Sequence, residues 1–594
     1  MICLTKAEKK KERGARQSFL QGALILTAGM AVVKVIGALF KIPLKYAIGE
    51  YGMGLFNVAY NFYGPIFSLA TAGFPIAIAR MVSEDSTLGR WNDVRQVKRV
   101  SLPAFLLAGL LGMVLITLAA PDYCEKIVGN QNALLPMLAL APAILFACVG
   151  AVFRGHYEGL RNMIPTAVSE IVEAVAKLLI GLSAACAVVS ACTEEYAANG
   201  TVFAVHPASP DEAVFLTLAF AAAAAVLGVT CGSIFSLFYL ALRYRFRGDG
   251  ITARMYREAP PARGKRETMK KLVATTLPIA VGSIAMNVAG LIDATFLQNR
   301  IGHIMETAPQ ALLACYKGQI PEIYLDSPSS VSTFLYGCYT LALTIYLLVP
   351  AITQAFGVSA LPSVTEAWTR GNKKEIKSSM ESVIRVTALF CFPAGLGISA
   401  LAEPIVQVLY GKGQSSSIIA GALFLLGLAS LAAALSTPLS SMLQAVGRMD
   451  LPVKLLFAAM GIKIAVNFWL CGIPEINIAG AGVGTLCCYL FLVVSQLWCL
   501  QKVTGVKISA GLLLRPLASA GVCACGAYFI YELFSRQFVL NSFGEAAALA
   551  AGIAVGAVVY VISLGLLHAV DRNDVLMLPK GQKIAKMLEK RGWI

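Results

Sequence analysis

The sequence has 594 residues, of which 57% are hydrophobic and only 14% charged, and it carries a formal net charge of +16. A soluble globule of this length needs more polar residues to cover its surface, so the composition excludes a soluble enzyme or binding domain and indicates a membrane protein.

Apolar runs of about 20 residues recur along the chain, and each is long enough to cross a hydrocarbon core of about 30 Å as a helix. The first follows a basic segment and continues past Lys34 without a small-residue cleavage site, which favours a membrane helix over a cleaved signal peptide. We predict an all-α polytopic membrane protein with about fourteen transmembrane helices. In chain order the predicted spans are 19–47, 52–79, 100–120, 132–153, 164–190, 213–241, 271–297, 331–357, 383–402, 418–443, 452–471, 478–501, 511–533 and 546–567.

Basic residues are concentrated on one side of these spans. The connector from Arg243 to Lys271 contains ten Lys and Arg residues, whereas the loop 191–213 contains none. Because Lys and Arg resist translocation, we predict that the connector and both termini are cytoplasmic, in a multi-pass protein of the cell (plasma) membrane. The positive charge is then a topology signal with the lipid bilayer as its partner, and no nucleic-acid-binding module accompanies it.

Two pairs of segments indicate an internal duplication. The segment "TAGFPIAIARMVSE" at 71–84 resembles "TQAFGVSALPSVTE" at 353–366, and "GLRNMIPTAV" at 159–168 resembles "VGRMDLPVKL" at 446–455. The nearly equal separations predict two six-helix repeats, which share one orientation because six is even, as in some alternating-access transporters. The predicted parts are a basic cytoplasmic N-terminus (1–18), an N lobe of helices one to six (19–242), a basic cytoplasmic linker (243–270), a C lobe of helices seven to twelve (271–501), helices thirteen and fourteen (502–567) and a cytoplasmic C-terminus (568–594).

Three lysines share one stripe of the first predicted helix. Lys34, Lys41 and Lys45 are spaced by seven and four residues, which are close to whole helical turns. A charge within the bilayer is costly unless it faces a cavity or a partner, so these lysines are candidate functional residues. Lys41 and Lys45 can alternatively extend toward the external headgroups, an explanation that fits the deeper Lys34 less well.

The fifth predicted helix carries a second charged face. Glu170, Glu173 and Lys177 lie on it, and Glu173 and Lys177 have the spacing of an i, i+4 ion pair. A pair that only fixes helix packing is the structural alternative. In the aligned repeat, Phe457 and Met460 take the places of the two glutamates, so we expect the polar cavity in the N-terminal half.

Four more charged residues lie at the predicted cytoplasmic ends of helices two and four. They are Arg80, Arg154, Glu158 and Arg161. Solvated helix ends are the simplest interpretation, and Arg154 and Glu158 have i, i+4 spacing. The same side chains are suited to a cytoplasmic rim that receives an anionic headgroup.

Asp293 in helix seven and Asn467 in helix eleven are candidates for a coupling-cation site, because a hard cation needs oxygen ligands. Na⁺ and H⁺ are the candidate ions. The 15 Cys and 4 His residues show no metal-ligand spacing, so we predict no metal site and no other cofactor. No motif of a soluble enzyme is present, and we predict no catalytic residues.

The segment "FRGHYEGLRNMIPTAVSEIVEAVAKLLIG" at 153–181 resembles a signature of the stage V sporulation protein B group of polysaccharide transporters, within the multidrug/oligosaccharidyl-lipid/polysaccharide flippase superfamily. The segment "KVIGALFKIPLKYAIGEYGMGLFNVAYNFYGPIFSLATAGFPIAIARMVSE" at 34–84 is similar to the first two helices of that group. Glu158 and Lys177 stand where the signature has Gln and Arg; the second change keeps the charge.

This resemblance implies a transporter rather than an enzyme. The implied function is export of an undecaprenyl-pyrophosphate-linked saccharide, such as lipid II or another cell-wall precursor, from the inner to the outer leaflet, in peptidoglycan or polysaccharide biosynthesis or sporulation. Cell-wall synthesis proteins are candidate partners. The cationic cavity that neutralises the pyrophosphate would be formed by Lys34, Lys41, Lys177 and Arg80, with Glu170 and Glu173 beside them.

Three alternatives remain open. A cation-coupled multidrug exporter of the same superfamily should have acidic or aromatic cavity residues, which the lysine stripe disfavours. A membrane glycan polymerase or ligase needs catalytic carboxylates or histidines on a large external loop, and the loops 191–213 and 298–330 contain no convincing pair. A non-transporting membrane scaffold for sporulation or division proteins is the third.

Overall fold

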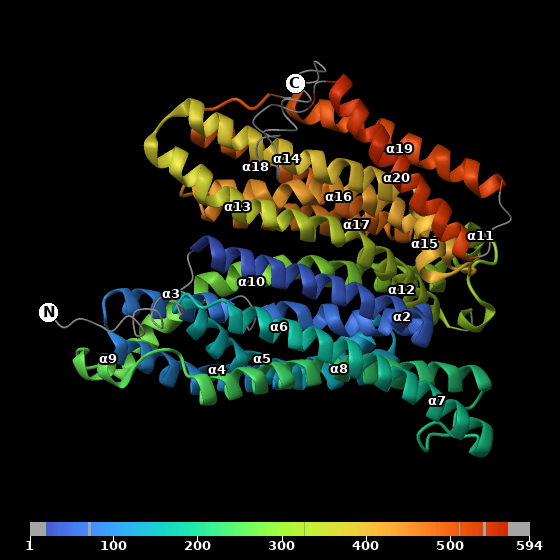
Figure 1. Ribbon diagram of the computed structural model, residues 1–594. Coiled ribbons are helices and arrows are strands. Elements are labelled where there is room, and N and C mark those ends of the chain that lie inside the picture. The colour runs from blue at the N-terminus through green and yellow to red at the C-terminus, as the bar shows by residue number, and fades with distance from the viewer. Residues whose placement is uncertain are drawn as a thin grey trace. The chain divides into compact units, whose positions relative to one another are not determined.

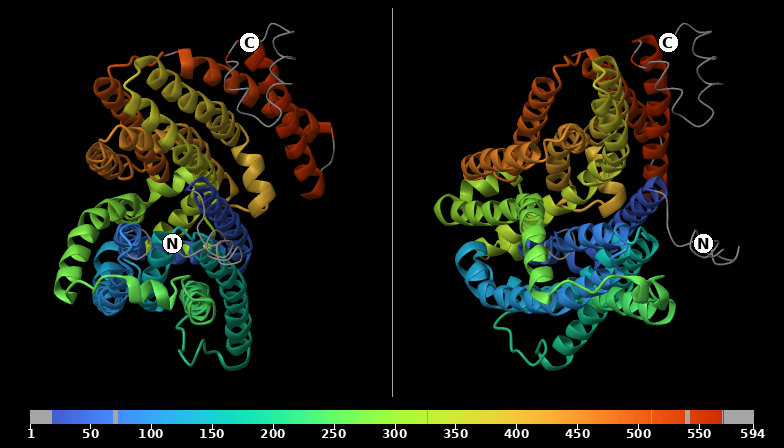
Figure 2. Two further views of the ribbon diagram at one scale, coloured as in Figure 1. Left: turned by 60° about the vertical axis from the view of Figure 1, so that its left-hand side comes forward. Right: turned by 90° about the vertical axis from the view of Figure 1, so that its left-hand side faces the viewer.

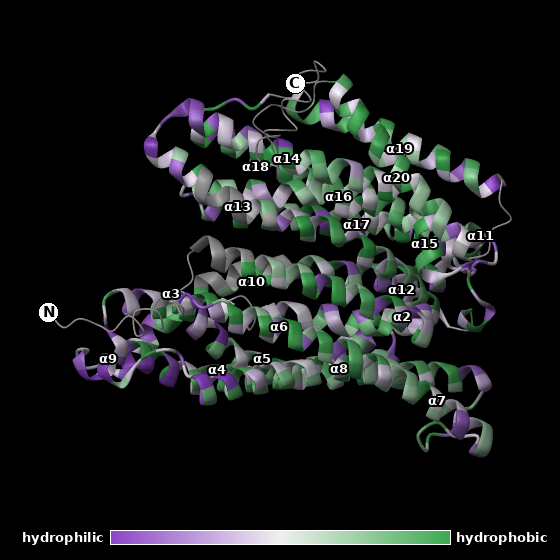
Figure 3. Cartoon of the chain, viewed as in Figure 1, coloured by the Kyte–Doolittle hydropathy of each residue, from purple (hydrophilic) through white to green (hydrophobic). Residues whose placement is uncertain are grey.

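The computed structural model describes residues 19–68, 73–325, 327–509, 511–537, 542–567 and 569. Regular structure in these residues is helical, apart from a single bridge between Val202 and Val205. Hydrophobic residues fill the middle of the long helices, and hydrophilic residues gather at their ends and in the short α9 (Figure 3). This distribution is typical of a membrane protein, whose spanning helices satisfy their own backbone hydrogen bonds. The predicted N-terminal segment 1–18 and nearly all of 568–594 lie outside the described residues.

The chain packs as two units, Met1–Asn299 and Arg300–Ile594. The long helices of the first unit are α2 (Phe19–Ser68), α3 (Phe74–Thr87), α4 (Trp91–Asp122), α5 (Leu134–Gly159), α6 (Ile164–Ala176), α7 (Leu182–Asn199), α8 (Pro210–Arg247) and most of α10 (Lys265–Thr307). Between them lie the shorter α9 (Ala253–Glu258), the 3₁₀ helix η3 (Gln131–Ala133) and the π-helices η2 (Tyr123–Val128) and η4 (Lys177–Gly181). Within this unit α5 packs against α3, α4 and α8, and α6 packs against α2 and α8 (Figure 1).

The second unit is built around α16. Its helices are α11 (Pro309–Tyr316), η5 (Glu322–Tyr324), α12 (Pro328–Tyr346), α13 (Leu348–Arg370), α14 (Lys373–Ala400), α15 (Ala402–Tyr410), α16 (Ser416–Ala445), α17 (Asp450–Leu470), α18 (Ile478–Thr504), α19 (Gly511–Gln537) and α20 (Ser542–Leu566). The central α16 contacts α12, α13, α14, α15 and α18, while α19 and α20 lie side by side with α19 against α14 (Figure 2). Met442, Leu443 and Cys391 are fully buried in its core.

Eleven helical segments of the described chain are long and apolar enough to cross a membrane, which makes this a multi-pass membrane protein. They are Trp91–Val128, Gln131–Gly159, Ile164–Asn199, Pro210–Arg247, Pro328–Gln354, Lys373–Ala400, Ser416–Ala445, Asp450–Leu470, Ile478–Thr504, Gly511–Arg536 and Gly544–Leu566. The other three predicted spans fall in α2, α3 and α10, and they remain predictions, as does the count of fourteen. The predicted lobes also remain predictions: they follow the repeat, whereas the packing of the chain divides it after Asn299.

The second predicted span, 52–79, falls on two described helical segments, and residues 69–72 between them lie outside the described residues. The helix α2 ends at Ser68 and α3 begins at Phe74, with Pro75 in its first turn. Proline lacks an amide hydrogen and fits the first turn of a helix, where that donor has no partner. The same α2 continues from the first predicted span into the second through a break at Gly49, whose φ of 62° is accessible to glycine at low cost.

Small residues bring α8 against the π-helix η4. A Cβ atom at Gly228 would lie 2.4 Å from the Cα of Gly181, and a Cβ atom at Gly232 would lie 2.7 Å from the carbonyl oxygen of Glu173. Close backbone approach through small residues is a common way for membrane helices to associate. Here it fixes the segment that carries Glu173 and Lys177.

We expect Gly228→Ala to destabilise the protein by about 1–3 kcal/mol, because the new methyl group meets backbone atoms that cannot rotate away. Gly150→Ala in α5 is the matched control, since nothing lies within 4 Å of its added Cβ. Thermal unfolding of the two purified variants measures the difference. Equal melting temperatures would show that the contact between α8 and η4 is not tight.

The basic linker after α8 is docked onto the first unit rather than free. The side-chain amide of Asn92 donates to the carbonyl oxygens of Tyr256, Ala259 and Pro260, at 3.1, 3.2 and 2.9 Å. Gln96 donates to the carbonyl oxygen of Arg263 at 3.1 Å. The first two turns of α4 therefore hold the linker backbone.

Two buried carboxylates hold the linker's Arg263. Its guanidinium pairs with both Asp85 and Asp93, and its amide donates to Asp93 Oδ1 at 2.7 Å. Burial raises the pKa of Asp85, and the positive charge of Arg263 opposes that shift. Each carboxylate is thus buried with the cation that compensates it.

A third contact lies at the start of the linker. His156 Nε2 is 3.0 Å from Asp249 Oδ2, and the Ile251 amide donates to Asp249 Oδ1 at 3.1 Å. Burial alone would raise the pKa of Asp249, but the hydrogen bonds from His156 and Ile251 hold it below its usual value. Asp249 is therefore a carboxylate at neutral pH.

We expect Asn92→Ala to expose the linker to trypsin. The change leaves three linker carbonyls without this donor, at a cost of about 1–3 kcal/mol, and about 1.4 kcal/mol raises the open population tenfold. Cleavage after Arg254 and Arg257 is followed over time by mass spectrometry. The exposed Asn299→Ala is the control, and equal cleavage of both variants would contradict the docking.

Candidate functional site: a cationic face of the first unit

Lys177, the first residue of η4, lies among aromatic rings. Its Nζ is 4.7–5.8 Å from the ring centroids of three α2 residues, Phe40, Phe56 and Tyr60. Aromatic rings attract an ammonium group without cancelling its charge. Within the described residues Lys177 forms no salt bridge, so its positive charge is held in place and left for an anion.

Two lysines of α2 lie near Lys177: Lys41 is close enough to both Lys177 and Lys34 for their positive charges to interact, and α2 packs against α6 and η4. Lys41 Nζ donates to Asn57 Oδ1 at 3.1 Å, and Lys34 is exposed. The amide oxygen of Asn57 has no formal charge, so this hydrogen bond does not neutralise Lys41. Lys45, which the spacing placed on the same stripe, lies 3.3 Å from Glu50 Oε1 and so has a carboxylate partner.

A buried ion pair lies behind this face. Arg154 is only 7% exposed, and its Nη2 is 2.7 Å from Glu173 Oε2. The guanidinium also donates to Ser169 and Ser236, at 3.1 and 2.8 Å, and Ser233 donates to Glu173 Oε1 at 3.2 Å. The network joins α5, α6 and α8, and it gives both charges the additional hydrogen bonds that a buried pair needs.

This network corrects two expected ion pairs. Glu173 pairs with Arg154 rather than with Lys177, because the Lys177 ammonium lies against the rings of α2. Arg154 in turn pairs across helices with Glu173 rather than along its own helix with Glu158. Arg154 is therefore a buried residue of the first unit and not a solvated rim residue.

The other predicted site residues of the first unit lie nearer the helix ends or are partly covered. Arg80 on α3 and Arg161 in the turn after α5 are exposed, which agrees with solvated helix ends. Glu158 is half-buried in the last turn of α5, and Glu170 is half-buried one turn before Glu173. The structure therefore places Lys34, Lys41 and Lys177 near one another, and no described contact joins Arg80 to them. The substrate-binding role of these residues stays a prediction.

The turns after α5 and α16 share one backbone pattern. The amides of Leu160, Arg161 and Asn162 donate to His156, Glu158 and Tyr157, and the amides of Val446, Gly447 and Arg448 donate to Met442, Gln444 and Leu443 in the same order. Arg161 therefore corresponds to Gly447, one residue before the Arg448 with which the sequence alignment paired it. Both have positive φ, 59° and 82°.

This register changes the comparison of the two halves. Counted from the turn, Lys177 corresponds to Lys463 of α17, which is only 3% exposed. Glu170 and Glu173 correspond to the apolar Leu456 and Ala459. The glutamates remain specific to the first half, whereas Lys177 has a counterpart when the two halves are counted from the turn.

The two candidate cation ligands belong to different units. Asp293 lies on α10 in the first unit and is 3% exposed, and Asn467 lies on α17 in the second and is fully buried. Among the described residues no group of three or more His, Cys, Asp and Glu could hold a metal ion. A shared cation site at these residues therefore stays a proposal.

The aromatic rings and the serines of this region were missed in the sequence. Phe56 and Tyr60 have i, i+4 spacing and stack with ring centroids 5.9 Å apart. This spacing is visible in the sequence, but nothing there indicated that the rings contact Lys177. Ser233 and Ser236 lie in an apolar run of α8 with no charged residue beside them in sequence, so nothing indicated that they contact Glu173 and Arg154.

Two family models match long segments of this chain. A model described as "Polysaccharide biosynthesis protein" matches residues 19–368, and one described as "Lipid II flippase MurJ" matches residues 214–549. Stage V sporulation protein B of Bacillus subtilis (strain 168) is 24% identical over 575 residues, covering 95% of this chain and 98% of that protein. Lipid II flippase MurJ of the same organism is 24% identical over 493 residues, covering 81% of each.

Solved structures support the same fold. Lipid II flippase MurJ in an inward closed conformation matches with a TM-score of 0.60 and 13% identity, over 92% of this chain and 99% of that one. An inward-facing multidrug resistance MATE family transporter of the MOP superfamily matches with a TM-score of 0.54 and 12% identity, over 84% and 98%. These relatives are flippases and transporters, not enzymes. Each family model matches more than half of the 594 residues, and the chain therefore belongs to the families described as "Polysaccharide biosynthesis protein" and "Lipid II flippase MurJ".

Proposed function

We propose that this protein is an alternating-access flippase that carries an undecaprenyl-pyrophosphate-linked saccharide, a lipid II-like peptidoglycan precursor or another cell-wall polysaccharide precursor, from the inner to the outer leaflet. The observation that carries the proposal is the cationic face of Lys34, Lys41 and Lys177, in which Lys177 is held by rings and has no carboxylate partner among the described residues. A pyrophosphate needs such cations to cross a low-dielectric layer. The relatives named as flippases support the class of substrate.

In this proposal some residues of the first unit bind the substrate and others position them. Lys177 and Lys41 bind the pyrophosphate, and the Arg154–Glu173 pair positions α6 so that Lys177 stays against α2. Two six-helix lobes with parallel orientation rock to alternate access, and helices thirteen and fourteen provide a groove for the lipid tail. In the proposed topology both termini are cytoplasmic and fourteen helices cross the plasma membrane. The shared turn pattern after α5 and α16 supports the repeat.

The driving force we propose is the membrane potential or a cation gradient. Asp293 and Asn467 are the residues we propose for coupling to Na⁺ or H⁺, because both are polar groups buried on membrane helices. Cell-wall synthesis proteins are the proposed partners, since they consume the exported precursor.

A cation-coupled multidrug exporter is the second candidate, and the structural likeness to a MATE family transporter favours it. Such an exporter would bind apolar cations. The ammonium groups of Lys34, Lys41 and Lys177 would repel them, so the charge of this face favours the anionic substrate.

Depletion in a strain that lacks paralogues tests the proposal. We expect lipid-linked precursors to accumulate in the inner leaflet, where an impermeant reagent added outside cannot modify them. A Lys34→Ala/Lys177→Ala gene should fail to restore labelling, whereas the wild-type gene should restore it. Unchanged labelling on depletion would contradict the flippase assignment, and full rescue by the double variant would contradict the cationic face.

A further inference from the structure

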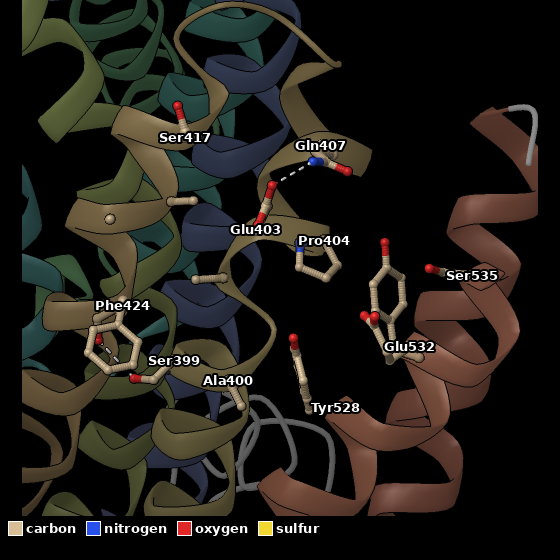
Figure 4. Close-up of a pocket in the computed structure, with 14 residues that line it drawn as sticks. Ser399, Ala400, Glu403, Pro404, Gln407, Ser417, Phe424, Tyr528, Glu532 and Ser535 are labelled. Atoms are coloured by element: carbon tan, nitrogen blue, oxygen red, sulfur yellow. Dashed lines mark hydrogen bonds between the residues drawn. The ribbon is translucent and has the colours of Figure 1, made fainter. Parts of the chain in front are cut away.

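A cavity of about 460 Å³ lies within the second unit, between α14, α15 and α16 on one side and α19 on the other. Figure 4 shows Glu403 and Gln407 of α15 facing Tyr528 and Glu532 of α19 across it. The function proposed above assigns α19 and α20 to the lipid tail and gives this polar cavity no role.

The walls of the cavity are fixed by packing. Leu401, Ala527 and Leu549 form a buried cluster that joins α15 to α19 and α20. Lys412, in the loop after α15, forms an ion pair with Glu545 of α20, whose side chain is 10% exposed. The cavity is thus held open by contacts beside it and is largely pre-formed, as ligand sites usually are.

The charged residues that line the cavity are both acidic. Glu403 accepts a hydrogen bond from Gln407 at 3.1 Å, and the salt-bridge partner of Glu532 among the described residues is Arg536, whose side chain is 77% exposed. The described lining residues include hydroxyl groups and the rings of Tyr528 and Tyr531, but no Lys, Arg or His. Carboxylates and aromatic faces both attract cations, so the cavity favours a positively charged ligand and disfavours a phosphate.

The size and lining of the cavity indicate which kind of cation fits it. A bare Ca²⁺ or Mg²⁺ is disfavoured, because the lining contributes only two carboxylates and no group of three or more His, Cys, Asp and Glu among the described residues could hold a metal ion. An organic ammonium group with its neighbouring atoms has the right dimensions. Tyrosines near the ends of membrane helices also lie at the depth of lipid headgroups.

We propose that this cavity binds a primary alkylammonium group at the outer interface of the membrane. The outer location rests on the topology proposed above, in which the connection from α14 to α16 is external. Two sources share this chemistry: the headgroup of an ethanolamine lipid, and an amino group on the peptide of an exported precursor. The second source also rests on the proposed function.

The test uses the full chain in nanodiscs of phosphatidylglycerol, which has no amine, with binding measured by calorimetry. The probes are dihexanoyl phosphatidylethanolamine, dihexanoyl phosphatidylglycerol and a free Ala-Glu-Lys-Ala-Ala peptide. We expect at least one amine probe to bind and the glycerol lipid not to bind. Glu403→Gln/Glu532→Gln should weaken binding about tenfold or more, as loss of two charge-assisted contacts predicts.

Glu475→Gln is the matched control, because Glu475 is exposed in the loop between α17 and α18. The exposed Glu403→Gln alone should weaken binding even if the double variant folds poorly. Binding of only the lipid or only the peptide identifies the source and supports the proposal. Equal binding of both lipids, equal binding by Glu403→Gln and Glu475→Gln, or no binding of any amine would overturn it. Lys177→Met should keep amine binding while translocation falls, so failure of one proposal is distinguishable from failure of the other.

Discussion

Lys177→Met is expected to reduce translocation of the lipid-linked precursor about tenfold or more while the protein stays folded. Methionine has a similar length and packs well against aromatic rings, so the contacts with Phe40, Phe56 and Tyr60 are largely kept. What is lost is the charge. A charge-assisted contact contributes about 1.5–3 kcal/mol, which corresponds to roughly ten- to hundredfold in binding of the pyrophosphate.

The variant is measured against Lys126→Met. Lys126 is 70% exposed and pairs with Asp122 one turn away, so its loss removes one lysine without touching the cationic face. Translocation rates in proteoliposomes and melting temperatures are compared for the two variants. Equal rates in both, with equal melting temperatures, would show that the Lys177 charge has no part in transport.

Arg154→Met is expected to lower the free energy of unfolding by about 3–5 kcal/mol, because it leaves the half-buried Glu173 carboxylate with its hydrogen bond from Ser233 but without its cation. The double variant Arg154→Met/Glu173→Leu should recover most of that loss, because it removes both charges and keeps the volume. Thermal or detergent unfolding of the four proteins of this cycle measures the coupling between the two residues.

Arg370→Met provides the matched control for this cycle. Arg370 pairs with Glu366, and both side chains are more than 60% exposed, so this pair should contribute no more than about 1 kcal/mol. A loss at Arg154 as small as that at Arg370 would contradict the buried ion pair. A double variant as unstable as Arg154→Met would show that the arginine acts through other contacts.

The helices of this protein follow from its sequence because hydrophobic length alone marks a membrane helix. Ile164–Asn199 and Pro210–Arg247 were expected from their apolar runs, and both are found as spans. Boundaries were less accurate: α14 begins at Lys373, ten residues before the predicted 383, because polar residues continue the helix beyond its apolar part.

Which charges are functional was harder to predict than where they lie. Glu173 and Lys177 have ideal spacing for a pair on one helix, yet each has a partner on another helix, and tertiary contacts of that kind leave no local signal. The one-residue shift at the turn before α17 arose because the sequence alignment matched Arg448 with Arg161 by residue type. The pattern of backbone hydrogen bonds instead makes Gly447 the residue equivalent to Arg161.

In the function we propose, the cationic face moves a pyrophosphate-linked lipid across the membrane. The most direct measurement reconstitutes the purified protein in liposomes that contain a lipid-linked saccharide, and follows how fast the saccharide becomes accessible to a membrane-impermeant enzyme. We expect transport by the wild type, at least about tenfold slower transport by Lys34→Ala/Lys177→Ala, and unchanged transport by Lys126→Ala. Saccharide that never becomes accessible with wild-type protein, or that does so equally with all three proteins, would contradict it.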